Sequence, residues 1–107
     1  MEIRAFQYLM KDLYFNKDKK RGINGTLLWF YEEIGEFSEA MRHYLLGEKT
    51  EDDNISKTEV KEEIADIIAW LCSIANLLGI DVEKALDEKY PDKCRKCGKN
   101  PCECQKL

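Results

Sequence analysis

Two pairs of carboxylates recur at the same spacing in the middle of this sequence. Glu33 and Glu36 lie three residues apart, and Glu63 and Asp66 repeat that spacing after a 26-residue gap. Residues three apart share one face of an α-helix, where like charges repel. Four carboxylates near a helical interface are costly unless a cation neutralises them, and such oxygen ligands favour Mg²⁺ or Mn²⁺ over zinc. The spacing therefore indicates a metal site, and the alternative is an ordinary solvated acidic face.

The charge distribution points to the same region. Residues 30–66 hold twelve acidic and four basic side chains, a local charge of −8, although the whole chain carries only −4. The acidic centre needs a cation to bind anything negatively charged, and the net charge argues against a general nucleic-acid-binding protein.

Four of the five cysteines form a second cluster near the end of the chain. They follow the spacing Cys94-x2-Cys97-x4-Cys102-x-Cys104. Two close pairs joined by a short turn can wrap four thiolates around one Zn²⁺, and four protein ligands leave no open position for catalysis. A disulfide-linked tail is the alternative, and Cys72, in an apolar helical run, is expected to be core.

Hydrophobic periodicity predicts the elements that position these groups. Helices are expected over residues 2–15, 26–46, 57–78 and from a cap at Asp81 to about 88 or 89, with a charged loop over 16–25. Asn24 or Thr26 is the expected cap of the second helix and Ser56 that of the third, while Gly47 and Gly79 end them. The prediction is an all-α protein: a small four-helix bundle-like domain over residues 1–90 and a zinc-knuckle-like four-cysteine tail over 91–107.

Helical phase places Glu63 among apolar residues. The third predicted helix has an apolar stripe of Val60, Ile64, Ile67, Leu71, Ile74 and Leu78, and Glu63 projects only about 40° from its centre. Glu33 lies at the margin of the corresponding stripe of the second helix. A solvated scaffold would have no reason for a carboxylate at position 63.

With these residues identified, the sequence resembles a known family. Glu33-Ile-Gly-Glu36 followed by Glu63-Ile-Ala-Asp66 is similar to the ExxE–ExxD signature of MazG-type nucleotide pyrophosphohydrolases, in the all-α NTP pyrophosphatase superfamily. The similarity spans about residues 3–90. It implies hydrolysis of (d)NTPs to monophosphate and pyrophosphate, as in house-cleaning of nucleotide pools. It also implies Mg²⁺ held by these four carboxylates and a homodimer or homotetramer.

Further roles can be assigned around this signature. Glu32 and Glu62 sit beside the motifs, where either could orient or deprotonate a water. Phosphate binding needs Lys or Arg, and the base needs an aromatic wall, for which ordinary core packing is the alternative. The candidates for substrate binding are Lys20, Arg21 and Lys61 for phosphates, with Lys17, Lys19 and Lys57 as further choices, and Trp29 and Trp70 for the base.

Two other functions remain open from the sequence. One is a zinc-knuckle module that binds protein or nucleic acid without catalysis, and the other is a related phosphoribosyl-ATP pyrophosphohydrolase. The sequence has no run of eighteen apolar residues and no secretory signal pattern at its N-terminus. A cytoplasmic protein without a membrane partner is therefore expected.

Overall fold

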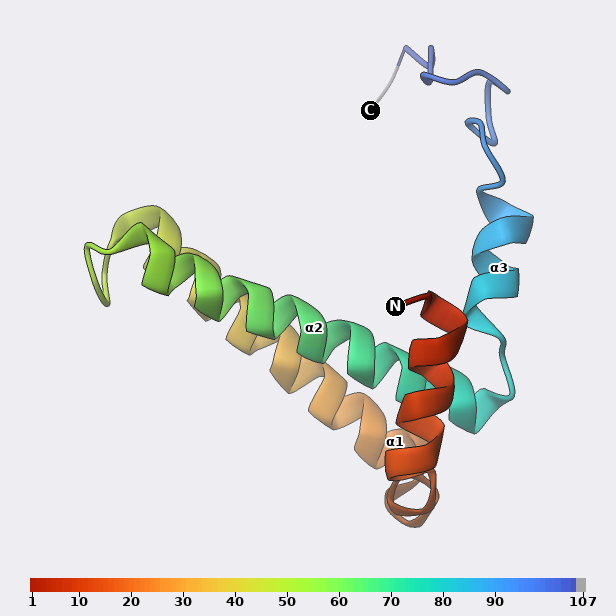
Figure 1. Cartoon of the computed structure of the whole chain (residues 1–107), viewed down its shortest axis with the longest axis horizontal. Coiled ribbons are helices and arrows are strands. Elements are labelled where there is room, and N and C mark those ends of the chain that lie inside the picture. The colour runs from red at the N-terminus through yellow and green to blue at the C-terminus, as the bar shows by residue number, and fades with distance from the viewer. Residues whose placement is uncertain (106–107) are drawn as a thin grey trace.

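A computed structural model describes residues 1–105, in which helices joined by short turns are followed by an irregular tail (Figure 1). The helices are α1 (Ile3–Leu46), α2 (Asp53–Leu78) and α3 (Val82–Lys89). No strand occurs among the described residues, so the predicted all-α class is confirmed.

Helix α1 is broken at a single residue, Gly22. Its φ of 81° and ψ of 168° are non-helical, and L side chains rarely adopt a positive φ. The predicted loop over residues 16–25 is therefore wrong, because residues 16–21 continue the first half of the helix. Thr26 does not cap a new helix either. Its hydroxyl donates to the Gly22 carbonyl at 2.8 Å from within the helix.

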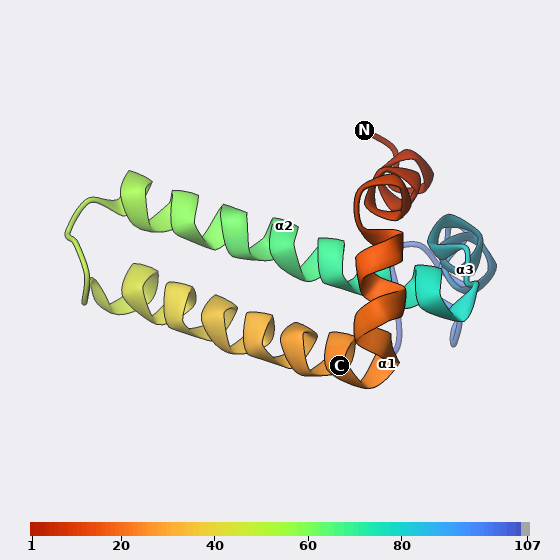
Figure 2. The same ribbon diagram turned by 90° about the horizontal axis from the view of Figure 1, so that it is seen from below.

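The second half of α1 and α2 run side by side as an antiparallel hairpin (Figures 1 and 2). Gly47 and Gly79 end the two helices in left-handed conformations, with φ of 63° and 67°, as predicted. The start of α2 differs from the prediction. The Asp52 carboxylate accepts from the Asn54 amide at 2.9 Å and caps the helix, so Ser56 lies buried inside it.

The first half of α1 crosses the C-terminal end of α2 (Figure 2). Gln7 in this half of α1 forms hydrogen bonds to that end of α2 and to the turn after it. The Gln7 amide donates to Asn76 Oδ1 at 3.0 Å and to the Ile80 carbonyl at 2.7 Å, and its oxygen accepts from the Val82 amide at 2.9 Å. These bonds tie the start of the chain to the turn between α2 and α3. Near the Gly22 break, the Arg21 guanidinium lies against the Trp70 ring of α2.

The apolar core of the described chain is small. Its buried apolar side chains are Met10, Ala40, Cys72 and Ala75, so the prediction for Cys72 is confirmed. The stripe expected to be buried on α2 is partly open, because Ile64 is 44% exposed and Leu71 47% exposed. The radius of gyration is 17.0 Å, against about 13 Å expected for a compact chain of this length. One copy therefore leaves much of its apolar surface uncovered.

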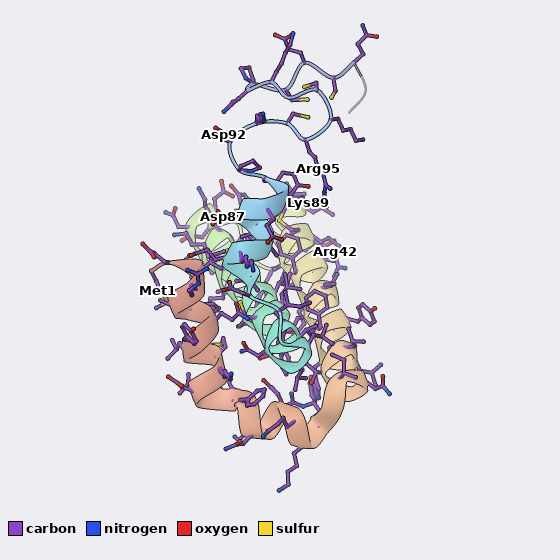
Figure 3. The ribbon with its side chains drawn as sticks, turned by 90° about the vertical axis from the view of Figure 1, so that its right-hand side faces the viewer. Met1, Arg42, Asp87, Lys89, Asp92 and Arg95 are labelled. Atoms are coloured by element: carbon purple, nitrogen blue, oxygen red, sulfur yellow. The ribbon has the colours of Figure 1, made fainter. Side chains whose placement is uncertain are left out.

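The cysteine-containing tail extends beyond the end of α3. Its sulfur atoms lie past Lys89 and Asp92, on the side away from the helices (Figure 3). The last two residues of the predicted tail, 106–107, lie outside the described part of the chain. In residues 1–105, no single helix is long and apolar enough to cross a membrane, and α2 with α3 qualifies by length and composition only as a pair bent by 98°.

Candidate active site

Three of the four predicted carboxylate ligands meet between the antiparallel helices. Glu33 and Glu36 come from the second half of α1 and Glu63 from α2, and one carboxylate oxygen of each lies within 4.8 Å of the others. We call Glu33, Glu36 and Glu63 the acidic cluster. Glu33 and Glu63 are partly buried and Glu36 is exposed. The hairpin thus brings together two sequence motifs that are about thirty residues apart.

The electrostatics of this cluster are those of crowded like charges. Burial raises the pKa of Glu33 and of Glu63, and repulsion from Asp66 adds to both shifts. The pKa of Glu36 is raised chiefly by the negative charge of Glu33. In the absence of a cation these groups therefore resist ionisation, which is the behaviour expected of carboxylates arranged for a positive ligand.

Two buried oxygens in the cluster have no hydrogen-bond partner, Oε2 of Glu33 and Oε2 of Glu63. Leaving such a group unsatisfied costs about 1–3 kcal/mol, and more when it is charged. A cation that accepts oxygen ligands satisfies both atoms and offsets the repulsion. The carboxylate donor set fits Mg²⁺ or Mn²⁺ on these grounds.

Asp66 lies at the edge of the cluster, outside the group of three oxygens. It nevertheless contributes to the raised pKa of all three glutamates, so it lies within electrostatic reach of each. Glu32 and Glu62, the predicted water-orienting residues, are both exposed. Of the two, Glu32 is close enough to Glu36 to raise its pKa.

A cavity of about 340 Å³ opens beside the cluster, and Asp66 forms part of its wall. Arg21 and Lys17 from the first half of α1 and Trp70 from α2 also line it. The Arg21 guanidinium lies 5.0 Å from the Trp70 ring centroid, in a cation–π contact. The structure thus places two candidate phosphate ligands, Arg21 and Lys17, and one candidate aromatic wall next to the acidic residues.

The other predicted substrate-binding residues are more scattered. Trp29 is 48% exposed and stacks on Trp70, with centroids 6.3 Å apart and ring planes 8° from parallel. Lys20 and Lys61 are exposed and do not line this cavity. Among the six candidate phosphate ligands, Arg21 and Lys17 line the cavity.

One buried acidic residue of this cavity, Asp18, was not predicted from the sequence. Asp18 is only 2% exposed, and its Oδ1 accepts from Arg21 Nη1 at 3.0 Å. Gly25 leaves room for this arrangement, because a Cβ there would lie 2.6 Å from Arg21 Cγ. The signal for the ion pair was present as an acid and a base three residues apart. It was hidden because residues 16–25 were assigned to a loop.

The four tail cysteines form a separate cluster with the geometry of a zinc site. Cys94 Sγ and Cys104 Sγ are 3.7 Å apart, Cys97 Sγ and Cys102 Sγ are 3.9 Å apart, and all four sulfurs lie within 4.8 Å of one another. A tetrahedron with Zn–S bonds of about 2.3 Å has edges of about 3.8 Å. These separations fit a shared Zn²⁺ and are far longer than a disulfide bond of about 2.05 Å.

Backbone amides prepare two of these sulfurs for metal binding. Amides of Cys97 and Lys96 lower the pKa of Cys94 to about 6, and amides of Glu103 and Lys99 lower the pKa of Cys97. Without a metal the charge is shared unevenly, because hydrogen bonds from Cys102 and the other thiols raise the pKa of Cys104 to about 12. The lowered pKa values of Cys94 and Cys97 favour the thiolate form, which is the form that binds a metal.

Comparison with known families places this geometry in context. A family model described as the MazG nucleotide pyrophosphohydrolase domain matches residues 21–98. The match begins at Arg21, includes both carboxylate pairs and continues past the predicted domain boundary at residue 90 to include Cys94 and Cys97. No curated protein matches the chain.

Proposed function

Because the chain belongs to the MazG nucleotide pyrophosphohydrolase family, we propose that it hydrolyses nucleoside triphosphates to the monophosphate and pyrophosphate with the help of a divalent cation. The observation that carries this proposal is the acidic cluster with its two unpartnered buried oxygens, Oε2 of Glu33 and Oε2 of Glu63. A site of this charge binds a triphosphate only when cations intervene.

The cation site would be formed by Glu33, Glu36 and Glu63, with Asp66 at its edge. Mg²⁺, or Mn²⁺ in its place, would supply a Lewis acid that offsets the charge of the carboxylates and of the phosphates. Hydrolysis itself needs a water oxygen to form a bond to the α-phosphorus while the bond to the bridging oxygen breaks and pyrophosphate leaves. Glu32 and Glu62 are the candidates to orient that water and accept its proton.

Arg21 is the best-supported phosphate ligand. It lines the cavity beside Asp66, it is 28% exposed, and the Asp18 carboxylate fixes its position. Lys17 lines the same cavity, whereas Lys20 and Lys61 would have to reach in from the surface. Trp70, with Trp29 stacked on it, provides the aromatic surface on which a base can lie.

The test of this function is a product assay. Purified protein is incubated with each common NTP and dNTP in Mg²⁺, and the monophosphate and pyrophosphate are quantified. Equal amounts of the two products support the proposal, and phosphoribosyl-ATP in a parallel reaction separates the related histidine-pathway activity. Release of inorganic phosphate in place of pyrophosphate would contradict it. A broad preference for non-standard nucleotides would favour a house-cleaning role.

We also propose that the tail binds one structural Zn²⁺ through Cys94, Cys97, Cys102 and Cys104. The sulfur separations support this assignment. Metal analysis of the purified chain should give one zinc per chain, falling to a small fraction in Cys97→Ser. Cys72→Ala is the matched control, because it removes a buried thiol on α2 that lies outside the cluster. Full zinc content in Cys97→Ser would refute the assignment.

A second copy of the chain is the proposed partner, in a homodimer or homotetramer. Ile64, Ile68 and Leu71 share one face of α2 and are 42–47% exposed, and Leu28 and Tyr31 on α1 are 70% and 61% exposed. The small core and the large radius of gyration support burial of these faces against another copy. Sedimentation should give at least twice the 12.5 kDa chain mass, and Leu71→Glu should shift it towards the monomer. A monomeric wild-type protein at micromolar concentration would exclude this.

A further inference from the structure

A buried acid–base pair lies in the cavity beside the acidic cluster, and the roles assigned so far use only its basic member. Asp18 and Arg21 lie one turn apart in the first half of α1, at the wall that faces Trp70 of α2. The Arg21 side chain passes over Gly25, and its guanidinium contacts both the Asp18 carboxylate, at 3.0 Å, and the Trp70 ring, at 5.0 Å from the centroid. A Cβ at residue 25 would displace the Arg21 side chain. The pair is therefore a built feature of the cavity wall.

Asp18 is not fully satisfied by Arg21. Its Oδ1 accepts from the guanidinium, but Oδ2 is buried without a hydrogen-bond partner, and the side chain is 98% buried. A carboxylate in this state requires a further N–H or O–H donor. Since the described residues supply none, the donor is expected to come with a ligand of the cavity.

Taking the nucleotide activity as its premise, we propose that Asp18 and Arg21 read the Watson–Crick edge of a guanine base that lies against Trp70. In this arrangement the Asp18 carboxylate accepts from guanine N1–H and the 2-amino group. Arg21 donates to O6 in place of the phosphates, which leaves Lys17 of the same cavity as the phosphate ligand. Arg21 is 28% exposed on a flexible stem, so it can move from the Trp70 face to the base edge and uncover Asp18. The vacated aromatic face then receives the base.

The other bases match this pair less well. Guanine offers two adjacent donors beside an acceptor, which is the pattern that a carboxylate next to a guanidinium complements. Cytosine and adenine offer a single amino group next to an unprotonated ring nitrogen. Uracil and thymine offer one N–H between two carbonyls, one of which would face the carboxylate. The position of the cavity agrees with this role, because Asp66 in its wall borders the acidic cluster where the phosphates would lie.

Binding of α,β-methylene nucleotide analogues, which resist cleavage at the reacting bond, tests the inference separately from turnover. Calorimetric titration of the full-length chain in Mg²⁺ should give a Kd for the guanosine analogue at least about fivefold below those of the adenosine, cytidine and uridine analogues, the low end of what one bidentate pair supplies. The inosine analogue, which lacks only the 2-amino group and keeps N1–H and O6, should bind more weakly than the guanosine analogue and more tightly than those three. Equal affinity for guanosine and inosine analogues would overturn the inference without any variant.

Asp18→Asn provides the second arm, with Asp12→Asn, an exposed carboxylate on the same helix, as its control. An asparagine amide presents a donor where guanine carries its 2-amino group, so the variant should lose the guanine preference and favour xanthosine triphosphate, whose 2-carbonyl accepts. An unchanged guanine preference in Asp18→Asn would overturn the assignment. Guanine-selective binding without pyrophosphate release would refute the proposed function alone, and pyrophosphate release without base preference would refute this inference alone.

Discussion

Replacing Glu63 by glutamine should stabilise the magnesium-free protein and remove most of its stabilisation by magnesium. Glu63 lies in the apolar face of α2, burial raises its pKa, and its Oε2 has no partner. Its carboxylate lies within 4.8 Å of that of Glu33. Glutamine keeps the shape of the side chain and removes its charge.

The size of the effect follows from that distance. Two unit charges about 4.8 Å apart repel by about 1–3 kcal/mol for effective dielectric constants between about 80 and 20. Because both carboxylates are partly exposed and one proton can be shared between them, the lower end of that range is the better expectation. A gain of about 1 kcal/mol raises the Tm of a chain of this size by about 4 °C or more.

Magnesium should also stabilise the wild type. A cation that binds only the folded state at one hundred times its Kd contributes about 2.7 kcal/mol, so wild-type Tm should rise with Mg²⁺ concentration. Glu63→Gln should lose most of that rise because it loses a ligand oxygen.

Thermal unfolding followed by circular dichroism measures both effects. Metal-free buffer without chelator leaves a zinc in the tail undisturbed. Glu51→Gln, an exposed acid between α1 and α2, is the control for the change in net charge. A Glu63→Gln variant that is less stable than wild type in metal-free buffer and keeps a full response to magnesium would refute the reasoning about the cluster.

Three further outcomes are expected. The Tm advantage of Glu63→Gln in metal-free buffer should grow as the pH rises above 4.5 and vanish towards acid pH. The reason is that the pKa of Glu33 and of Glu63 is raised in the folded state, so the folded wild type loses stability as these carboxylates ionise. A pH-independent difference between the two Tm values would contradict this. Trp70→Ala should raise KM at least about fivefold with a smaller change in kcat in steady-state assays, because a base loses its stacking surface; a loss confined to kcat would contradict the assigned role. Gly22→Ala should lower the free energy of unfolding by about 1–2 kcal/mol, since φ is 81° at this residue. Gly35→Ala should raise it by about 0.5–1 kcal/mol, because a Cβ there meets nothing within 4 Å in a regular helix. Equal effects of the two substitutions in denaturant titrations would contradict the assigned break.

The sequence was informative where spacing alone determines geometry. Carboxylates three residues apart on a helix must share a face, and an antiparallel hairpin with glycine ends at Gly47 and Gly79 brings the two faces together. The same holds for the tail, where short intervals between cysteines leave few ways to arrange the sulfurs. The spacing therefore predicts the four-cysteine cluster and three of the four carboxylates assigned to the acidic site, whereas Asp66 lies outside that group.

The errors had two origins, helix propensity that was underestimated and packing between segments far apart in the sequence. The run of charged residues before Gly22 looked like a loop, yet charged residues such as lysine, which are good helix formers, extend α1 up to the one residue that breaks it. Asp18 could not be identified because its burial depends on how the first half of α1 crosses α2, which Gln7 fixes through residues about seventy positions away. The partial exposure of the apolar stripe of α2 was missed for a related reason, because covering the stripe needs side chains that one copy of the chain does not supply.

The most direct test of the central claim is the product ratio for a nucleoside triphosphate in the presence and absence of Mg²⁺. The structure-based account predicts one pyrophosphate released per monophosphate formed with Mg²⁺, and no measurable release in metal-free buffer or with Glu63→Gln. Failure to release pyrophosphate from any NTP or dNTP in Mg²⁺ or Mn²⁺, by a protein shown to be folded, would contradict it.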